Sequence, residues 1–193
     1  SKSTINICIP VFNEEKNINK LYEDLKIKIS DLEKKYDMIL KIVFFDDGSS
    51  DNSRQILEKL EDIELLYVDE NKGLGNAIRE LCMHSKETGV NGMFKVDGDG
   101  QMDLDDLNKF LENDMHKNKD VIYGNRFHKS SNYKMPLHRR FGSKIFKIFL
   151  KLFSIDISDP TNGFIYLSKK YLANSKIIGN YNAAQQILLD AKL

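Results

Sequence analysis

The chain has 193 residues, of which 41% are hydrophobic and 30% are charged, so it can form one folded domain with a buried core. Its 29 Lys and Arg residues balance 29 Asp and Glu residues, which argues against a protein that binds nucleic acid through bulk positive charge. Two cysteines, Cys8 and Cys82, are too few for a disulfide framework or a four-cysteine zinc site. We expect them to be inert core thiols in a reducing compartment.

The apolar segments are short. None approaches the about 20 residues of a membrane span, since the run at 38–45 is too short and contains Lys41. No signal peptide is predicted, because a strand pattern begins almost at the first residue. The chain starts without Met and ends within a predicted helix, 182–193. We therefore expect one catalytic domain, residues 1–193, that is truncated at its C-terminus.

Apolar, β-rich runs alternate with longer helical patterns along the chain, which is typical of βαβ units. The predicted strands are 5–10, 39–45, 63–68, 93–96, 121–123 and 164–167. The predicted helices are 14–36, a short one after residue 51, 74–85, 104–111 and 137–153. The sequence therefore predicts an α/β, Rossmann-like, mostly parallel sheet with helices on both faces.

Polar residues follow the first two predicted strands, at the sheet edge where open α/β folds bind ligands. Pro10 ends the first strand, Asn13 is placed to cap the next helix, and Glu14 favours the positive end of that helix. Asp46 and Asp47 close a buried strand, where carboxylates are costly unless a base N–H, ribose hydroxyls or other groups pair with them. The alternatives are helix punctuation at the first position and an Asx turn at the second.

A third acidic segment follows the fourth predicted strand. Asp97, Asp99 and Gln101 alternate along it, so an extended backbone would direct their side chains to one point. Two carboxylates and an amide oxygen are hard ligands that suit Mg²⁺ or Mn²⁺ bridging phosphate oxygens. The segment is not an EF-hand, because Met102 and Asn108 occupy the positions that require Gly and Glu. The remaining alternative is a solvated acidic loop.

Residues 71–77 precede and open a predicted helix. They match neither the dinucleotide fingerprint nor a P-loop. Lys72 lies near the helix N-terminus, and both supply positive potential. We therefore expect this segment to meet a diphosphate.

In order and spacing, these segments resemble the inverting family 2 glycosyltransferases of the GT-A fold. The matching pieces are 9–15 (Ile-Pro-Val-Phe-Asn-Glu-Glu), 46–51 (Asp-Asp-Gly-Ser-Ser-Asp), 71–75 (Asn-Lys-Gly-Leu-Gly) and 97–101 (Asp-Gly-Asp-Gly-Gln). Three more are similar to polyprenyl-phosphate sugar transferases such as dolichyl-phosphate mannose synthase: 123–127 (Tyr-Gly-Asn-Arg-Phe), 136–143 (Pro-Leu-His-Arg-Arg-Phe-Gly-Ser) and 159–164 (Asp-Pro-Thr-Asn-Gly-Phe). The resemblance covers nearly the whole chain. It implies a nucleotide-binding half, about residues 1–100, and an acceptor-side half, about 101–193.

The resemblance also implies a nucleotide-sugar donor, a divalent cation and roles for the matching residues. The residues implied around the nucleotide are Pro10, Phe12, Glu14, Asp46, Asp47, Lys72 and Asp97. Those implied to hold Mg²⁺ or Mn²⁺ are Asp97, Asp99 and Gln101. Those implied to bind the acceptor phosphate are Arg126, Arg139 and Arg140, and the implied catalytic residues are Asp99 and Arg126.

Residues 121–155 contain no Asp or Glu but many Lys and Arg, which predicts a local positive field that suits a phosphate. A phosphate acceptor is already anionic, whereas a sugar hydroxyl would need a carboxylate base. In the predicted helix 137–153, Lys144, Lys147 and Lys151 recur among apolar residues, as in a helix lying at a membrane interface. The alternative is a surface helix packed on the sheet.

Together these features predict transfer of a sugar from a UDP- or GDP-sugar to a polyprenyl phosphate, with inversion at the anomeric carbon. The expected setting is the cytoplasmic face of a membrane, with peripheral attachment, no nucleic-acid partner and homo-oligomerisation left open. One alternative is the same fold acting on a saccharide hydroxyl in surface-polysaccharide synthesis. Others are a non-catalytic sugar-nucleotide-binding or lipid-docking fragment and a nucleotidyltransferase. A nucleotidyltransferase usually has a Gly-rich basic loop after its first strand, and residues 10–15 do not form such a loop.

Overall fold

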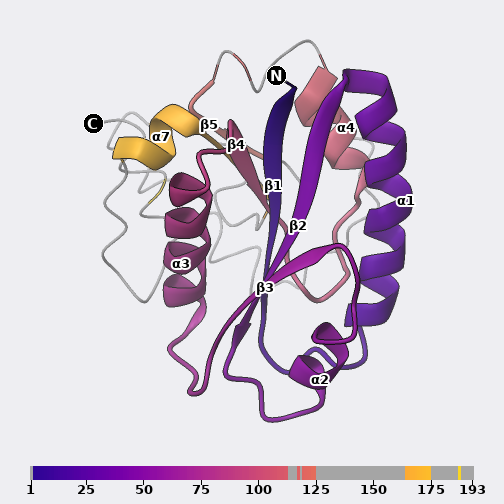
Figure 1. The fold of residues 1–193 in the computed structure, drawn as a ribbon, viewed down its shortest axis with the longest axis vertical. Helices are drawn as coiled ribbons and strands as arrows, with labels where there is room; N and C mark the ends of the chain where they lie inside the picture. The colour runs from indigo at the N-terminus through magenta and orange to yellow at the C-terminus, as the bar shows by residue number, and fades with distance from the viewer. Residues whose placement is uncertain (1, 113–116, 118, 125–163, 175–186, 188–193) are drawn as a thin grey trace, which may run out of the picture.

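The apolar runs of the sequence form one sheet flanked by helices (Figure 1). The computed structural model describes residues 2–112, 117, 119–124, 164–174 and 187. The strands in this part are β1 (Ser3–Val11), β2 (Met38–Asp47), β3 (Ile63–Val68), β4 (Gly92–Lys95), β5 (Val121–Tyr123) and β6 (Ile165–Ser168). The helices are α1 (Ile18–Tyr36), α2 (Ser53–Leu57), α3 (Leu74–Glu87), α4 (Asp105–Leu111) and α7 (Lys169–Asn174).

The sheet has six strands in the order β3-β2-β1-β4-β6-β5. β1 pairs in parallel with β2 and β4, and β2 pairs in parallel with β3. β6 runs antiparallel to both of its neighbours, β4 and β5. The predicted mostly parallel α/β sheet is therefore confirmed, with one antiparallel strand inserted near an edge.

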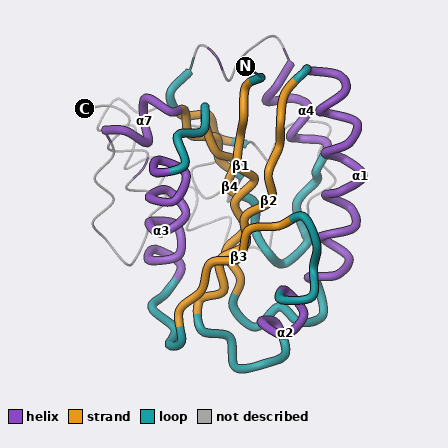
Figure 2. Tube along the Cα trace, viewed as in Figure 1, coloured by secondary structure: helices purple, strands orange, loops and turns teal. Residues whose placement is uncertain are grey.

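Two apolar cores cover the two faces of the sheet, with α1 and α4 on one side and α3 and α7 on the other (Figure 2). In the first core, the rings of Phe94 and Phe110 meet edge to face with 5.7 Å between their centroids. The second core contains Cys8 and Cys82, which are free thiols as expected. Burial raises the pKa of both thiols, that of Cys8 to about 12, so neither is a reactive thiolate at neutral pH.

Helix α1 begins at Ile18, four residues later than predicted, and the expectation that Asn13 caps it is wrong. Asn13 has a φ of 57°, in the left-handed region that Asn tolerates. Its Oδ1 accepts hydrogen bonds from the amides of Ser50 and Asp51, at 2.8 and 3.3 Å, and so holds the loop before α2. Asn17 is the N-cap residue of α1, and its side chain makes no capping hydrogen bond.

Several predicted features lie outside the described residues. These are the helix 137–153, the helix 182–193 apart from residue 187, and the arginines Arg126, Arg139 and Arg140. Within the described part, no helix is both long and apolar enough to cross a bilayer.

Candidate functional site

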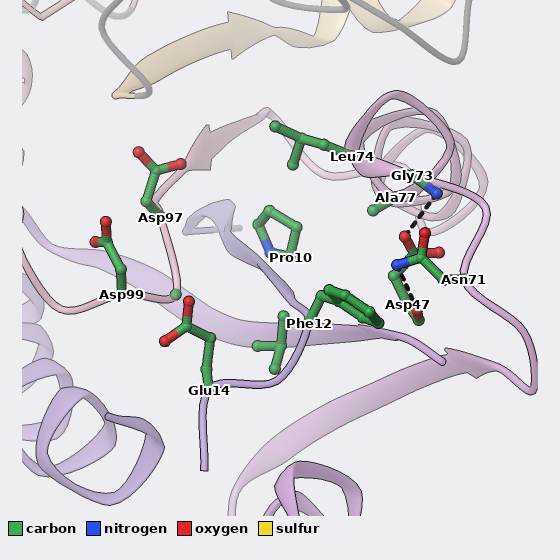
Figure 3. A pocket seen from close by; sticks show the side chains of 12 residues that line it. Pro10, Phe12, Glu14, Asp47, Asn71, Gly73, Leu74, Ala77, Asp97 and Asp99 are labelled. Carbon is green, nitrogen blue, oxygen red and sulfur yellow. Dashed lines mark hydrogen bonds between the residues drawn. The ribbon is translucent and has the colours of Figure 1, made fainter. Parts of the chain in front are cut away.

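A cavity of about 410 Å³ opens where β1, β2 and β4 end (Figure 3). Its walls come from the ends of these strands, the loop after β4 and the start of α3. Parallel strands end at a common edge, which explains why segments far apart in the sequence meet here. The described lining residues are Pro10, Val11, Phe12, Glu14, Asp47, Asn71, Gly73, Leu74, Ala77, Asp97, Gly98 and Asp99.

Asp47, the last residue of β2, fixes one end of the cavity. Its side chain is 3% exposed, and its two oxygens accept hydrogen bonds from the amides of Lys72 at 3.0 Å and Gly73 at 2.8 Å. The side-chain amide of Asn71 donates to the Asp47 carbonyl at 3.2 Å. A Cβ at Gly48 would lie 2.6 Å from the Asn71 amide nitrogen, so this close approach requires glycine. Asp47 thus anchors the turn that leads into α3.

Asp46 lies apart from the cavity, unlike its neighbour. Its carboxylate is fully buried and accepts a hydrogen bond from Arg54 Nε at 2.7 Å, and the Ser49 amide donates to it at 3.2 Å. The Arg54 guanidinium also lies 4.1 Å from the centroid of the Tyr67 ring. The structure therefore places Asp46 in a buried ion pair and not in the cavity lining. That lining includes Pro10, Phe12, Glu14, Asp47 and Asp97, which were also predicted to bind the nucleotide.

Asp97 and Asp99 lie at the opposite end of the cavity, near Glu14 (Figure 3). The buried ammonium of Lys95 pairs with Oδ1 of Asp97, and the amide of Gln101 donates to Oδ1 of Asp99 at 3.0 Å. In both Asp97 and Asp99, Oδ1 accepts a hydrogen bond from a described residue, whereas Oδ2 accepts none from the described part of the chain.

Gly98, between these aspartates, packs against β1. A Cβ there would meet the Pro10 carbonyl oxygen at 2.8 Å, so glycine allows the loop to lie close to the strand. Close packing of this loop brings Asp97 and Asp99 to the same cavity as Pro10.

Two residues predicted to belong to the site, one to bind the metal ion and one to bind the nucleotide, are not part of the described cavity lining. Gln101 is exposed and contributes its backbone amide to Asp99, and Lys72 is exposed and contributes its backbone amide to Asp47. The structure does not bring either side chain into the lining. Among the described residues, no three His, Cys, Asp or Glu side chains gather as a metal site.

The donor set at Asp97 and Asp99 fits a hard divalent cation. Mg²⁺ usually binds through one or two carboxylates and completes its shell with water and substrate phosphates. Two carboxylates that line one cavity, each with an oxygen not bonded to the described residues, meet this requirement. A cation here would therefore take the rest of its shell from water and phosphate oxygens.

The middle of the cavity is apolar. Phe12 and Leu74 line it and remain 45% and 55% exposed, although both are large hydrophobic residues. Sequence reasoning assigned no role to Leu74, Ala77 or Lys95. A lysine that ends an otherwise apolar strand was the available signal for Lys95, whereas Leu74 and Ala77 follow ordinary helical periodicity.

The sequence model of glycosyl transferase family 2 matches residues 6–175. The chain belongs to this family. One similar protein is the UDP-N-acetylglucosamine–dolichyl-phosphate N-acetylglucosaminyltransferase of Methanococcus voltae, with 27% identity over 97% of this chain and 80% of that enzyme. Another is the dolichyl-phosphate beta-glucosyltransferase of Saccharomyces cerevisiae, with 31% identity over 56% of this chain and 33% of that enzyme.

Solved structures share the fold of this family 2 chain. TarS of S. aureus, residues 1–349, aligns with a TM-score of 0.62 and 17% identity over 97% of this chain and 55% of TarS. Mannosyl-3-phosphoglycerate synthase of Rubrobacter xylanophilus aligns with a TM-score of 0.59 and 14% identity over 87% of this chain and 54% of that chain. The expected GT-A fold is thereby confirmed, and this chain spans about half the length of either structure.

Proposed function

We propose that this chain transfers a sugar from a UDP-sugar to a polyprenyl phosphate such as dolichyl phosphate. The observation that carries the proposal is the meeting of Asp97 and Asp99 with Asp47 in one cavity of a family 2 chain. The Methanococcus voltae relative, which aligns over most of both chains, is named as an enzyme that uses a UDP-sugar and dolichyl phosphate. A UDP complex of TarS is known as well, and TarS has the same fold.

The donor would lie along the cavity from Asp47 to Asp99. The exposed side chains of Phe12 and Leu74 offer apolar area to a nucleoside, and Asp47 with Asn71 bounds that end. The diphosphate would lie at the other end. When bound there, Mg²⁺ or Mn²⁺ would act as a Lewis acid that neutralises the departing diphosphate, held by Asp97 and Asp99.

The proposed reaction is a single displacement. An oxygen of the acceptor phosphate attacks the anomeric carbon from the face opposite the nucleoside diphosphate, a new C–O bond forms, and the bond to the diphosphate breaks. The configuration inverts and the nucleoside diphosphate leaves with the bonding electron pair. The acceptor is already anionic at neutral pH, so no carboxylate has to remove a proton from it.

The acceptor part of the proposal rests on the sequence. Arg126, Arg139 and Arg140, which belong to the acid-free segment 121–155, would bind the acceptor phosphate. Arginine forms paired hydrogen bonds with phosphate, and two anionic substrates that approach each other need such cations. Contact of the same segment with a membrane surface belongs to the proposal too.

Radiolabelled transfer tests the proposal. The full protein is incubated with Mn²⁺ or Mg²⁺, a panel of UDP- and GDP-sugars, and either a polyprenyl phosphate or a free saccharide. We expect a UDP-sugar to be consumed when polyprenyl phosphate is present and the product to carry the inverted anomer. Equal transfer to the saccharide would contradict the lipid acceptor and favour polysaccharide synthesis on the same fold.

A further inference from the structure

Lys95 is a buried lysine next to the cavity. Its side chain is 5% exposed, and its ammonium pairs with Oδ1 of Asp97, which is itself 35% exposed. In the sheet, Lys95 is paired with Cys8 of β1 and Ile165 of β6, both of which belong to the apolar core under α3 and α7. Since directly paired residues of neighbouring strands share a face, the lysine stem lies in an apolar layer.

Folding alone gives little reason for a lysine at this position. An ammonium in an apolar layer loses its hydration, and the attraction to one carboxylate only offsets that loss. Replacing a buried ion pair by apolar side chains of similar volume is often neutral or stabilising. The unbranched stem of Lys95 could be matched by methionine, which packs in such layers. The charge of Lys95 therefore calls for an explanation at the cavity.

The cavity has an excess of negative charge. The charged side chains in its described lining are all carboxylates: Glu14, Asp47, Asp97 and Asp99. A diphosphate placed among them would be repelled, and a divalent cation would be balanced by Asp97 and Asp99 without positive charge to spare. The ammonium of Lys95, in direct contact with Asp97, supplies the additional positive charge.

We propose that Lys95 is a positioning residue of the diphosphate site, acting through Asp97. Its ammonium donates a hydrogen bond to Oδ1 of Asp97, which leaves Oδ2 for a cation. Its positive charge also favours the diphosphate group of a nucleotide. This inference rests on the proposed function, because it takes a nucleoside diphosphate as the ligand of the cavity.

Lys95→Met tests this role, with Lys41→Met as the matched control. Lys41 is also a strand lysine paired with a carboxylate, Glu64 at 3.4 Å, but it is 48% exposed and lies outside the cavity lining. Calorimetry measures the binding of UDP and of uridine in the presence of Mn²⁺. We expect Lys95→Met to weaken UDP binding at least tenfold and uridine binding less than twofold, because uridine lacks the diphosphate. Lys41→Met should change neither.

A double variant tests whether Lys95 acts through Asp97. We expect Lys95→Met to weaken UDP binding by a smaller factor in the Asp97→Asn background than in the wild type, because the part of its effect that acts through Asp97 is already lost there. Thermal unfolding of the ligand-free proteins checks the pair itself: Asp97→Asn leaves a buried unpaired ammonium and should lower the midpoint, and adding Lys95→Met should restore it. If Lys95→Met does not fold, Lys95→Gln retains a hydrogen-bond donor without the charge and should show the same loss of UDP binding.

The outcomes separate this inference from the proposed function. Wild-type UDP affinity in folded Lys95→Met, or an equal loss for UDP and uridine, would overturn the role of Lys95 while the donor site stands. A wild-type protein that binds no nucleoside diphosphate with Mn²⁺ would overturn the proposed function and the role of Lys95 with it.

Discussion

Adjacent aspartates at the end of β2 have different roles because successive residues of a strand face opposite sides of the sheet. Asp47 faces the cavity and anchors the turn before α3, whereas Asp46 points away and pairs with Arg54. The sequence could predict that two carboxylates after a buried strand need partners. The strand period also allows only one of two neighbours to face a ligand, but it does not say which one, because that depends on register.

The buried pair gives a prediction at this scale. Arg54→Met leaves the fully buried Asp46 carboxylate without its guanidinium, and removing one partner of a buried pair costs about 3–5 kcal/mol. Urea denaturation should therefore show a large loss of unfolding free energy. In Arg54→Met combined with Asp46→Leu, which removes both charges, most of this loss should be recovered. A single variant as stable as the wild type would contradict a structural role for the pair.

Among the elements, apolar runs predicted the six strands, most of which are covered on both faces. Hydrophobic periodicity predicted the helices α1, α3 and α4 to within a few residues, because burial of one helix face imposes the period. It did not reveal that β6 lies antiparallel between β4 and β5, since pairing partners are chosen by tertiary packing. The predicted start of α1 was wrong because contacts with residues distant in sequence fix the segment before it. The amide of Glu14 binds Ser53 Oγ at 2.8 Å, a residue far along the chain, and so serves the loop rather than the helix.

Helices α1 and α4 are joined by an ion pair between Lys28 and Asp105. The hydrogen bond from Lys28 holds the pKa of Asp105 below its usual value. The pair therefore stabilises the fold fully above the ordinary carboxyl pKa of about 3.9 and loses its effect as the pH falls through the lower folded-state value. Because Asp105 is exposed, the contribution is less than about 1 kcal/mol.

Denaturation of wild type and Asp105→Asn across pH measures this contribution. We expect the variant to be slightly less stable at neutral pH and the difference to fade as the pH falls below about 3.9. High salt should reduce the difference as well. A difference that grows in acid would contradict the assignment of the pair.

At the scale of the whole molecule, the order of the strands places the ends of β1, β2 and β4 at one edge and so creates the cavity. The sequence could predict this edge, and with it the meeting of Pro10, Glu14 and Asp97, because parallel strands end together. It did not predict that Leu74 and Ala77 of α3 line the cavity or that Lys95 pairs with Asp97, because both depend on how the elements pack against one another. The predicted position of Gln101 was wrong because side chains alternate in direction only along an extended backbone, and the chain turns around Asp99.

The central claim is that Asp97 and Asp99 hold a divalent cation against the diphosphate of a nucleotide. A crystal structure with UDP and Mn²⁺, with anomalous scattering to locate manganese, tests this claim most directly. We predict one manganese peak bound by both carboxylates and by diphosphate oxygens. Bound UDP with no manganese at these two side chains would contradict the account.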